Sequence, residues 1–163
     1  MNPELLCMRC MSSLHEPNGV CPVCGFANAA AQNAPNQLDC GSILAGTYLV
    51  GCVLGQGGFG ITYIGWDLNL GIKVAIKEYY PEGCVLRDIH TYSDVRPLPG
   101  ARGEAFLSGK EHFVREAQIL ARFSGEPGVI GVRAFFQENG TAYIVMDYAE
   151  GETLKKYVSS RGG

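Results

Sequence analysis

The sequence predicts an α+β protein in which a small cysteine-rich module precedes a lobe made of an antiparallel sheet and one main helix. Four of the seven cysteines lie in the first 26 residues, which sets that segment apart from the rest. Strand-like segments dominate from residue 41 onward, and one later segment has helical periodicity. We therefore divide the chain into residues 1–26, a linker at 27–40 and a lobe at 41–163.

Composition narrows the class of protein. Hydrophobic residues make up 47% and charged residues 18% of the 163 residues, so most of the chain is able to form a packed core. A net charge of −3 argues against a protein whose main task is to coat nucleic acid. The first residues, MNPELLCMRCM, lack the basic and apolar regions of a secretory signal. We therefore expect a cytoplasmic protein with reduced cysteines.

The four early cysteines form two CxxC pairs, Cys7 with Cys10 and Cys21 with Cys24. Each pair is able to turn two thiolates toward one ion, and two such turns complete a tetrahedron, so we predict a structural Zn²⁺ site. Two disulfides or a dithiol redox pair are the alternatives. The module carries too little positive charge to read nucleic acid, and protein contact or structural support is the better interpretation. We expect a chelator to unfold residues 1–26 and leave the lobe mostly intact.

Five segments of the lobe have the composition or alternation of strands. They cover residues 48–54, 61–66, 72–79, 132–137 and 142–146. The uncharged stretch from Cys40 to Trp66 is long enough to cross a membrane, but its eight glycines favour strands and turns. Residues 81–109 are predicted to be a loop or insertion. A helix is expected from Glu111 to Phe123, with Phe113, Ala117, Leu120 and Ala121 on one face, and a short helix near Glu152.

The segment VLGQGGFGITYIGWD carries the spacing Gly55-x-Gly57-x-x-Gly60. In a dinucleotide-binding βαβ unit, the last glycine of such a motif opens a helix. Here β-branched and aromatic residues follow Gly60, so the motif is predicted to join two strands as a hairpin over a phosphate chain. The Gly-Lys-Ser/Thr ending of a P-loop is also missing.

Two more elements follow the hairpin in order. Val74-Ala-Ile-Lys77 lies one strand later, and Glu116 lies on the predicted helix, where it is able to hold the lysine by an ion pair. Together these elements resemble the N-terminal lobe of a protein kinase. Lys77-Glu-Tyr-Tyr-Pro81, the insertion and the preceding cysteines are similar, more narrowly, to a bacterial serine/threonine kinase subgroup. The resemblance covers about residues 40–160.

The resemblance implies a five-stranded sheet, bound ATP and a set of site residues. Lys77 and Glu116 would be the catalytic pair of this lobe, and Met146 the gatekeeper before a hinge whose backbone at Asp147 and Ala149 meets adenine. Thr62 stands where the family usually has valine, and Val53 and Ala75 would also enclose the base. The full set of nucleotide-binding residues implied is Leu54, Gly55, Gln56, Gly57, Gly58, Phe59, Gly60, Thr62, Ala75, Lys77, Met146, Asp147 and Ala149.

The family's His-Arg-Asp loop and Asp-Phe-Gly segment are missing from the sequence, and with them the expected Mg²⁺ ligands. Two interpretations follow. The chain is the ATP-binding part of a serine/threonine kinase whose C-terminal lobe follows in cis, and is inactive alone. Alternatively, it is a naturally truncated, non-catalytic nucleotide-binding or protein-interaction module docked through its zinc ribbon. Neither interpretation names the protein substrate.

Overall fold

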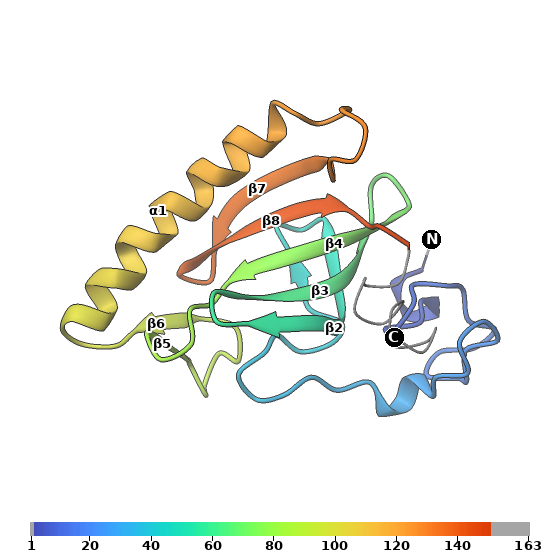
Figure 1. Ribbon diagram of the computed structural model, residues 1–163. Helices are drawn as coiled ribbons and strands as arrows, with labels where there is room; N and C mark the ends of the chain where they lie inside the picture. Colours follow the sequence, from blue (N-terminus) through green and yellow to red (C-terminus); the bar gives the residue numbers. More distant parts are fainter. Residues whose placement is uncertain (1, 151–163) are drawn as a thin grey trace, which may run out of the picture.

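A computed structural model describes residues 2–150 of the chain. Its centre is an antiparallel sheet with strand order β1-β2-β3-β4-β8-β7, and helix α1 lies along the β7–β8 side of this sheet (Figure 1). The bounds are β1 Ile43–Leu44, β2 Tyr48–Gly57, β3 Gly60–Asp67, β4 Ile72–Tyr79, β7 Val132–Glu138 and β8 Thr141–Asp147. All five expected strands are therefore present, and β1 extends the sheet by two residues.

Helix α1 spans Ala101–Ala121 and so begins well before the expected Glu111. Gly103 and Gly109 lie in its first half and obscure the helical pattern, because glycine is a poor helix former. Both are needed for close packing: a Cβ at Gly103 would collide with the Leu98 carbonyl, and one at Gly109 with the Tyr79 hydroxyl. The expectation that this half of the helix belongs to a loop was wrong, because tertiary contact overrides propensity here.

The expected apolar face of the helix is only partly buried. Phe113 and Ala117 are buried, Leu120 is half-buried and Ala121 is exposed. Tyr79 at the end of β4 packs against this face, with its ring centroid 5.3 Å from that of Phe113 in a tilted arrangement. The core between helix and sheet is therefore centred on aromatic contacts in the first three quarters of α1. The short helix expected near Glu152 lies outside the described residues.

Residues 81–100, also expected to be irregular, contain a small second sheet. Strands β5, Val85–Arg87, and β6, Val95–Pro97, form an antiparallel hairpin. The hairpin is attached to the main sheet by the Val95 N–H, which donates to the Asn139 carbonyl at 2.8 Å. Val85 and Val95 are buried in the main core. The insertion is thus a structured cover for one end of the sheet.

The segment at 27–40 is ordered against the lobe and passes along the sheet toward β1 (Figure 1). The buried Asn33 side chain donates to the carbonyls of Leu38 and Gly51, at 2.7 and 3.1 Å, and accepts from the Val53 N–H. Leu38 is fully buried in the main core. Buried amide groups need such partners, so Asn33 fastens this strap to β2. No helix in the described part of the chain is long and apolar enough to span a membrane.

Candidate nucleotide and metal sites

The glycine motif forms the turn between β2 and β3, with Gly58 and Phe59 at its tip. A Cβ built on Gly55, Gly57 or Gly58 would meet no atom within 4 Å. Gly60 differs, since its Cβ would lie 2.5 Å from the Glu78 carbonyl oxygen. Gly55, Gly57 and Gly58 therefore border open space, whereas Gly60 is required by the close approach of β3 to β4.

The tip of this hairpin is anchored to the chain that follows β4. The Tyr80 N–H donates to the Phe59 carbonyl at 3.2 Å, and the Glu82 N–H donates to the Gly58 carbonyl at 3.1 Å. The side chain of Phe59 is nonetheless 80% exposed. The glycine hairpin is thus held at its tip by two backbone bonds while its outer surface stays accessible.

Pairing across the strands brings the predicted base-facing and phosphate-facing residues together. Thr62 of β3 is paired with Lys77 of β4, and Ala75 of β4 is paired with Met146 of β8. Directly paired residues share a face, and Ala75 and Lys77 share one because they are two positions apart. Thr62 lies on β3, which is one of the two strands that form the glycine hairpin. One face of the sheet therefore holds Thr62, Ala75, Lys77 and Met146.

The structure does not pair Lys77 with Glu116. The Lys77 ammonium lies 5.8 Å from the ring centroid of Phe113, and Glu116, one turn further along α1, is exposed. Among the described residues, the ion pairs involve other partners, and neither Lys77 nor Glu116 takes part in one. Phe113 thus occupies the position beside the lysine that the expected carboxylate would take.

The predicted hinge follows β8. The Asp147 N–H donates to the Gly131 carbonyl at 2.9 Å, and its carboxylate accepts from Arg133 at 2.5 Å. Ala149 lies two residues further and is exposed, lining a shallow groove with Ile130. The backbone of the predicted hinge is therefore tied to the segment before β7 and faces an open groove.

The four early cysteines converge on one point. The Sγ atoms of Cys7 and Cys24 are 3.7 Å apart, those of Cys10 and Cys21 are 3.6 Å apart, and all four lie within 4.8 Å of one another. A tetrahedral Zn²⁺ with bonds of about 2.3 Å would place its sulfurs roughly 3.8 Å apart. The thiol cluster therefore fits a four-cysteine metal site.

The two cysteine turns have the same construction. The Met11 N–H donates to the Cys7 carbonyl and the Gly25 N–H to the Cys21 carbonyl, at 2.8 and 2.9 Å. Both residues have positive φ, 58° at Met11 and 71° at Gly25. The glycine is the ordinary choice there, whereas a methionine is strained. Met11 is buried, and this burial offsets the strain.

The buried Met11 side chain joins the cysteine module to the lobe. A Cβ on Gly51 of β2 would collide with the Met11 methyl group, with the Met8 carbonyl and with Ile64 of β3. The Cys52 N–H also donates to the Met8 carbonyl at 2.7 Å. Leu6, Met8, Met11, Leu49 and Ile64 form one buried apolar cluster. Ile64 is paired with Ala75, so the module packs on the same face of the sheet as the predicted nucleotide residues.

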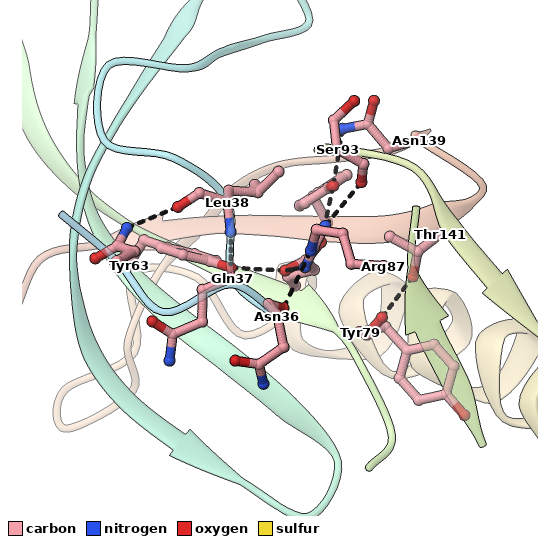
Figure 2. A network of polar contacts seen from close by, with 12 residues as sticks. Asn36, Gln37, Leu38, Tyr63, Tyr79, Arg87, Ser93, Asn139 and Thr141 are labelled. Atoms are coloured by element: carbon pink, nitrogen blue, oxygen red, sulfur yellow. Dashed lines mark hydrogen bonds and ion pairs between the residues drawn. The ribbon is translucent and has the colours of Figure 1, made fainter. Parts of the chain in front are cut away.

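A buried polar cluster is centred on Glu78, which follows Lys77 on β4 and so lies on the opposite face of the sheet. Figure 2 labels two of its members, Tyr63 and Arg87. The Glu78 side chain is fully buried and accepts two hydrogen bonds from Arg87, at 2.9 and 2.8 Å. The hydroxyls of Tyr63 and Tyr143 also donate to it, at 2.8 and 3.0 Å. Both carboxylate oxygens are therefore doubly satisfied, as a buried charge requires.

Arg87 in turn ties three segments together. Figure 2 shows its guanidinium between Asn36 and Ser93, and it donates to both of their carbonyls, at 3.0 and 2.7 Å. Burial alone would lower the pKa of Arg87, but the hydrogen bonds and charge of Glu78 outweigh burial and raise it. Burial, followed by the charge of the same carboxylate, raises the pKa of Tyr63 and of Tyr143. Arg87 thus stays charged, and the two tyrosines around it stay neutral.

Sequence reasoning did not single out Glu78 or Arg87. A signal was available, because Glu78 continues the core-facing register of Val74 and Ile76 on a predicted strand. A carboxylate at such a position predicts a buried cation partner. The identity of this cation was not predictable, because Arg87 lies in a segment whose sequence has no helical or strand periodicity.

Sheet, helix and glycine hairpin together have the fold of a protein-kinase N-terminal lobe. A solved structure titled "PpkA-294 apo form" superimposes on 77% of this chain with a TM-score of 0.69 and 37% identity, and the match covers 43% of that chain. No protein-family profile matches the chain.

The curated relatives point to one class of kinase. Serine/threonine-protein kinase B of Synechocystis is 29% identical over 146 residues, which are 85% of this chain and 23% of the relative. Serine/threonine-protein kinase PrkC of Bacillus subtilis is 30% identical over 122 residues, which are 75% of this chain and 16% of the relative. The chain therefore resembles the N-terminal lobe of bacterial serine/threonine protein kinases and spans less than a quarter of these relatives.

Proposed function

We propose that this chain is the ATP-binding part of a serine/threonine protein kinase, which transfers the γ-phosphate of ATP to protein hydroxyls. The observation that carries the proposal is the single sheet face that holds Ala75, Lys77 and Met146 beside an open glycine hairpin. A nucleoside triphosphate needs apolar side chains around its base, and it needs a cation and backbone N–H groups beside its phosphates.

Each residue then has a separate role. The exposed hairpin at Gly55, Gly57 and Gly58 covers the phosphates, and Lys77 neutralises their charge. Thr62, Ala75 and Met146 enclose the base from this one face of the sheet, together with Leu54. ATP brings Mg²⁺, whose protein ligands we assign to a C-terminal lobe in cis.

The proposal includes a rearrangement of helix α1. Lys77 faces Phe113 in the structure, while Glu116 is exposed. A rotation of α1 that withdraws Phe113 would bring Glu116 to the lysine and complete an ion pair. Phe113 is buried and lies against Tyr79, so this rotation gives up apolar contact, and the binding of nucleotide and of the C-terminal lobe would supply the free energy for it.

The decisive experiment uses the protein with its natural sequence beyond residue 163. The gene is sequenced past that codon, the complete protein is expressed, and transfer of labelled γ-phosphate to a generic protein substrate is measured. Lys77→Ala is expected to reduce kcat by about 10²–10³-fold, as for loss of a group that stabilises transition-state charge. Lys73→Ala is the matched control, since this lysine shares the strand and face of Lys77 and pairs with Glu150.

One result would contradict the role proposed for Lys77, and another would contradict the kinase proposal itself. Equal activity of Lys77→Ala and the unchanged protein would remove Lys77 from the chemistry. A stop codon directly after codon 163 would leave a lobe without His-Arg-Asp or Asp-Phe-Gly segments. The protein would then be the non-catalytic nucleotide-binding or interaction module.

We further propose that Cys7, Cys10, Cys21 and Cys24 hold one structural Zn²⁺. The convergence of the four sulfurs supports this assignment. The ion would supply folding free energy to a segment too short for a core of its own. Metal analysis is expected to find one Zn²⁺ per chain. The double variant Cys10→Ser/Cys21→Ser should contain none. Unchanged metal content in that variant would contradict the site. Reduced thiols of this kind are consistent with a cytoplasmic protein, the location we propose.

A further inference from the structure

Two of the three cysteines outside the metal cluster lie against each other. The Sγ atoms of Cys40 and Cys52 are 3.8 Å apart, although eleven residues separate the two in sequence. Both side chains are half-buried. Cys84 is also half-buried, and within the described residues no other thiol contacts it. No sequence pattern distinguishes these three cysteines from one another, and the contact of Cys40 with Cys52 is seen only in the folded chain.

Backbone hydrogen bonds hold the pair in this position. The Gly41 N–H donates to the Val50 carbonyl and the Val50 N–H to the Ser42 carbonyl, both at 2.8 Å. Through these two hydrogen bonds, the segment after Cys40 lies antiparallel to β2. On the other side, the Cys52 N–H donates to the Met8 carbonyl at 2.7 Å. Three backbone hydrogen bonds therefore hold the chain next to Cys40 and Cys52 in the position that brings their sulfurs together.

We propose that Cys40 and Cys52 form an oxidisable dithiol, which a peroxide converts to a disulfide that fastens the end of the 27–40 strap to β2. Two thiols in contact do not form a four-ligand metal site, and in the described part of the chain no third His, Cys, Asp or Glu ligand atom joins them. A disulfide requires the sulfurs to approach from 3.8 Å to about 2.05 Å, which side-chain rotation and a small backbone shift can supply.

The chemistry is balanced with hydrogen peroxide as oxidant. The Cys52 thiolate attacks one peroxide oxygen, the O–O bond breaks, and the departing hydroxide takes a proton to become water. The Cys40 sulfur then attacks the sulfenic sulfur of Cys52, the S–O bond breaks, and the released hydroxide takes the Cys40 proton. The two thiols lose two electrons, the peroxide gains them, and two water molecules leave.

The environment of the pair gives the two thiols different roles. Burial, followed by the charge of Cys52, raises the pKa of Cys40 to about 12. Cys40 therefore remains a thiol at neutral pH and is the resolving partner, which leaves the Cys52 sulfur to attack the peroxide oxygen first.

The position of the bond links it to both candidate sites. Cys52 lies three residues before Gly55 and pairs through its backbone with Met8 of the first cysteine turn. Both thiols also pack against the apolar cluster that joins the module to the lobe. Oxidation would thus fix the root of the glycine hairpin against the strap.

The test maps thiols in the reduced, zinc-loaded 163-residue chain after graded doses of hydrogen peroxide. Free thiols are alkylated, the chain is cleaved after Tyr48 and neighbouring residues without reduction, and peptides are identified by mass spectrometry. Alkylation of Cys40 and Cys52 is expected to fall together to near zero as a joined peptide pair appears. Cys84→Ser is the matched control and should give the same pair, whereas Cys52→Ser should give none.

A second measurement separates this bond from chance oxidation. The rate of its formation should not change over a tenfold range of protein concentration, because both thiols belong to one chain. Retention of label on Cys40 and Cys52 at doses that oxidise Cys84 would overturn the proposal. So would linkage of either residue to another molecule or to a cysteine of the metal cluster.

Discussion

Two neighbouring residues of β4 have opposite electrostatic surroundings. Glu78 is fully buried on one face of the sheet, and its two oxygens accept four hydrogen bonds from Arg87, Tyr63 and Tyr143. Lys77 lies on the other face, half-buried, with Phe113 as the neighbour of its ammonium group. The expected partner of Lys77 on α1 points to solvent.

This comparison distinguishes a side chain that stabilises the fold, Glu78, from one that is available for binding, Lys77. A buried carboxylate without partners would cost several kcal/mol, so Glu78 has to be satisfied for the chain to fold at all. A lysine that reaches water has no such requirement. Under the proposed function, this lack of a fixed partner allows Lys77 to bind a phosphate, or to pair with Glu116 after a movement of helix α1.

The largest expected effect comes from breaking the closed cluster. Glu78→Ala leaves the Arg87 charge buried without its counter-ion and should lower the free energy of unfolding by about 3–5 kcal/mol. Urea denaturation, followed by fluorescence of Trp66, the single tryptophan, measures this change. Glu116→Ala is the matched control on the exposed carboxylate and should change stability by about 0.5 kcal/mol or less. Similar losses in the two variants would refute the contrast.

The next effect concerns the contact between the cysteine module and the lobe. Met11→Ala removes a buried side chain from the cluster with Leu49 and Ile64 and should cost roughly 2–5 kcal/mol. From this packing we predict that a chelator also destabilises the lobe, in contrast to the expectation that it unfolds residues 1–26 alone. Because Trp66 borders the cluster, chelation should shift its emission and lower the urea midpoint of the lobe.

A matched substitution at the second turn tests the source of this coupling. Val23 is 71% exposed, so Val23→Ala should leave the midpoint nearly unchanged. A lobe whose urea midpoint is the same with and without chelator, and in Met11→Ala, would show that the two parts are independent.

A smaller effect is expected from the glycines of the hairpin. Gly60→Ala places a methyl group 2.5 Å from the Glu78 carbonyl and should destabilise the lobe by about 1–3 kcal/mol. Gly58→Ala enters open space and should change the urea midpoint little, while weakening binding of a fluorescent ATP analogue in the complete protein. Equal destabilisation by both substitutions would mean that the hairpin is more crowded than the structure shows.

The smallest change in stability is expected at Lys77. Lys77→Ala removes only a partly exposed cation near Phe113, an interaction worth about 0.5–1 kcal/mol. Thermal unfolding of the isolated chain should therefore be almost unaffected, in contrast to the large effect proposed for phosphate transfer. A loss comparable to that of Glu78→Ala would show that Lys77 also holds the fold.

Local patterns in the sequence were sufficient to predict the five long strands of the main sheet and the thiol cluster, but not β1, β5 or β6. Alternation along residues 72–79 predicts β4 with its observed bounds, because side chains on a strand alternate between two faces. The spacing of Cys7, Cys10, Cys21 and Cys24 predicts their convergence, because two short turns produce it with few long-range contacts.

Contacts between distant segments were decided only by the tertiary structure. Helix α1 begins at Ala101 because two glycines fit against Leu98 and Tyr79, and no propensity indicates this. The partnership of Glu78 with Arg87, the contact of Cys40 with Cys52 and the strained, buried Met11 arise in the same way. Each depends on which segments the sheet brings together, and the free energy of those contacts outweighs the local preferences of the chain.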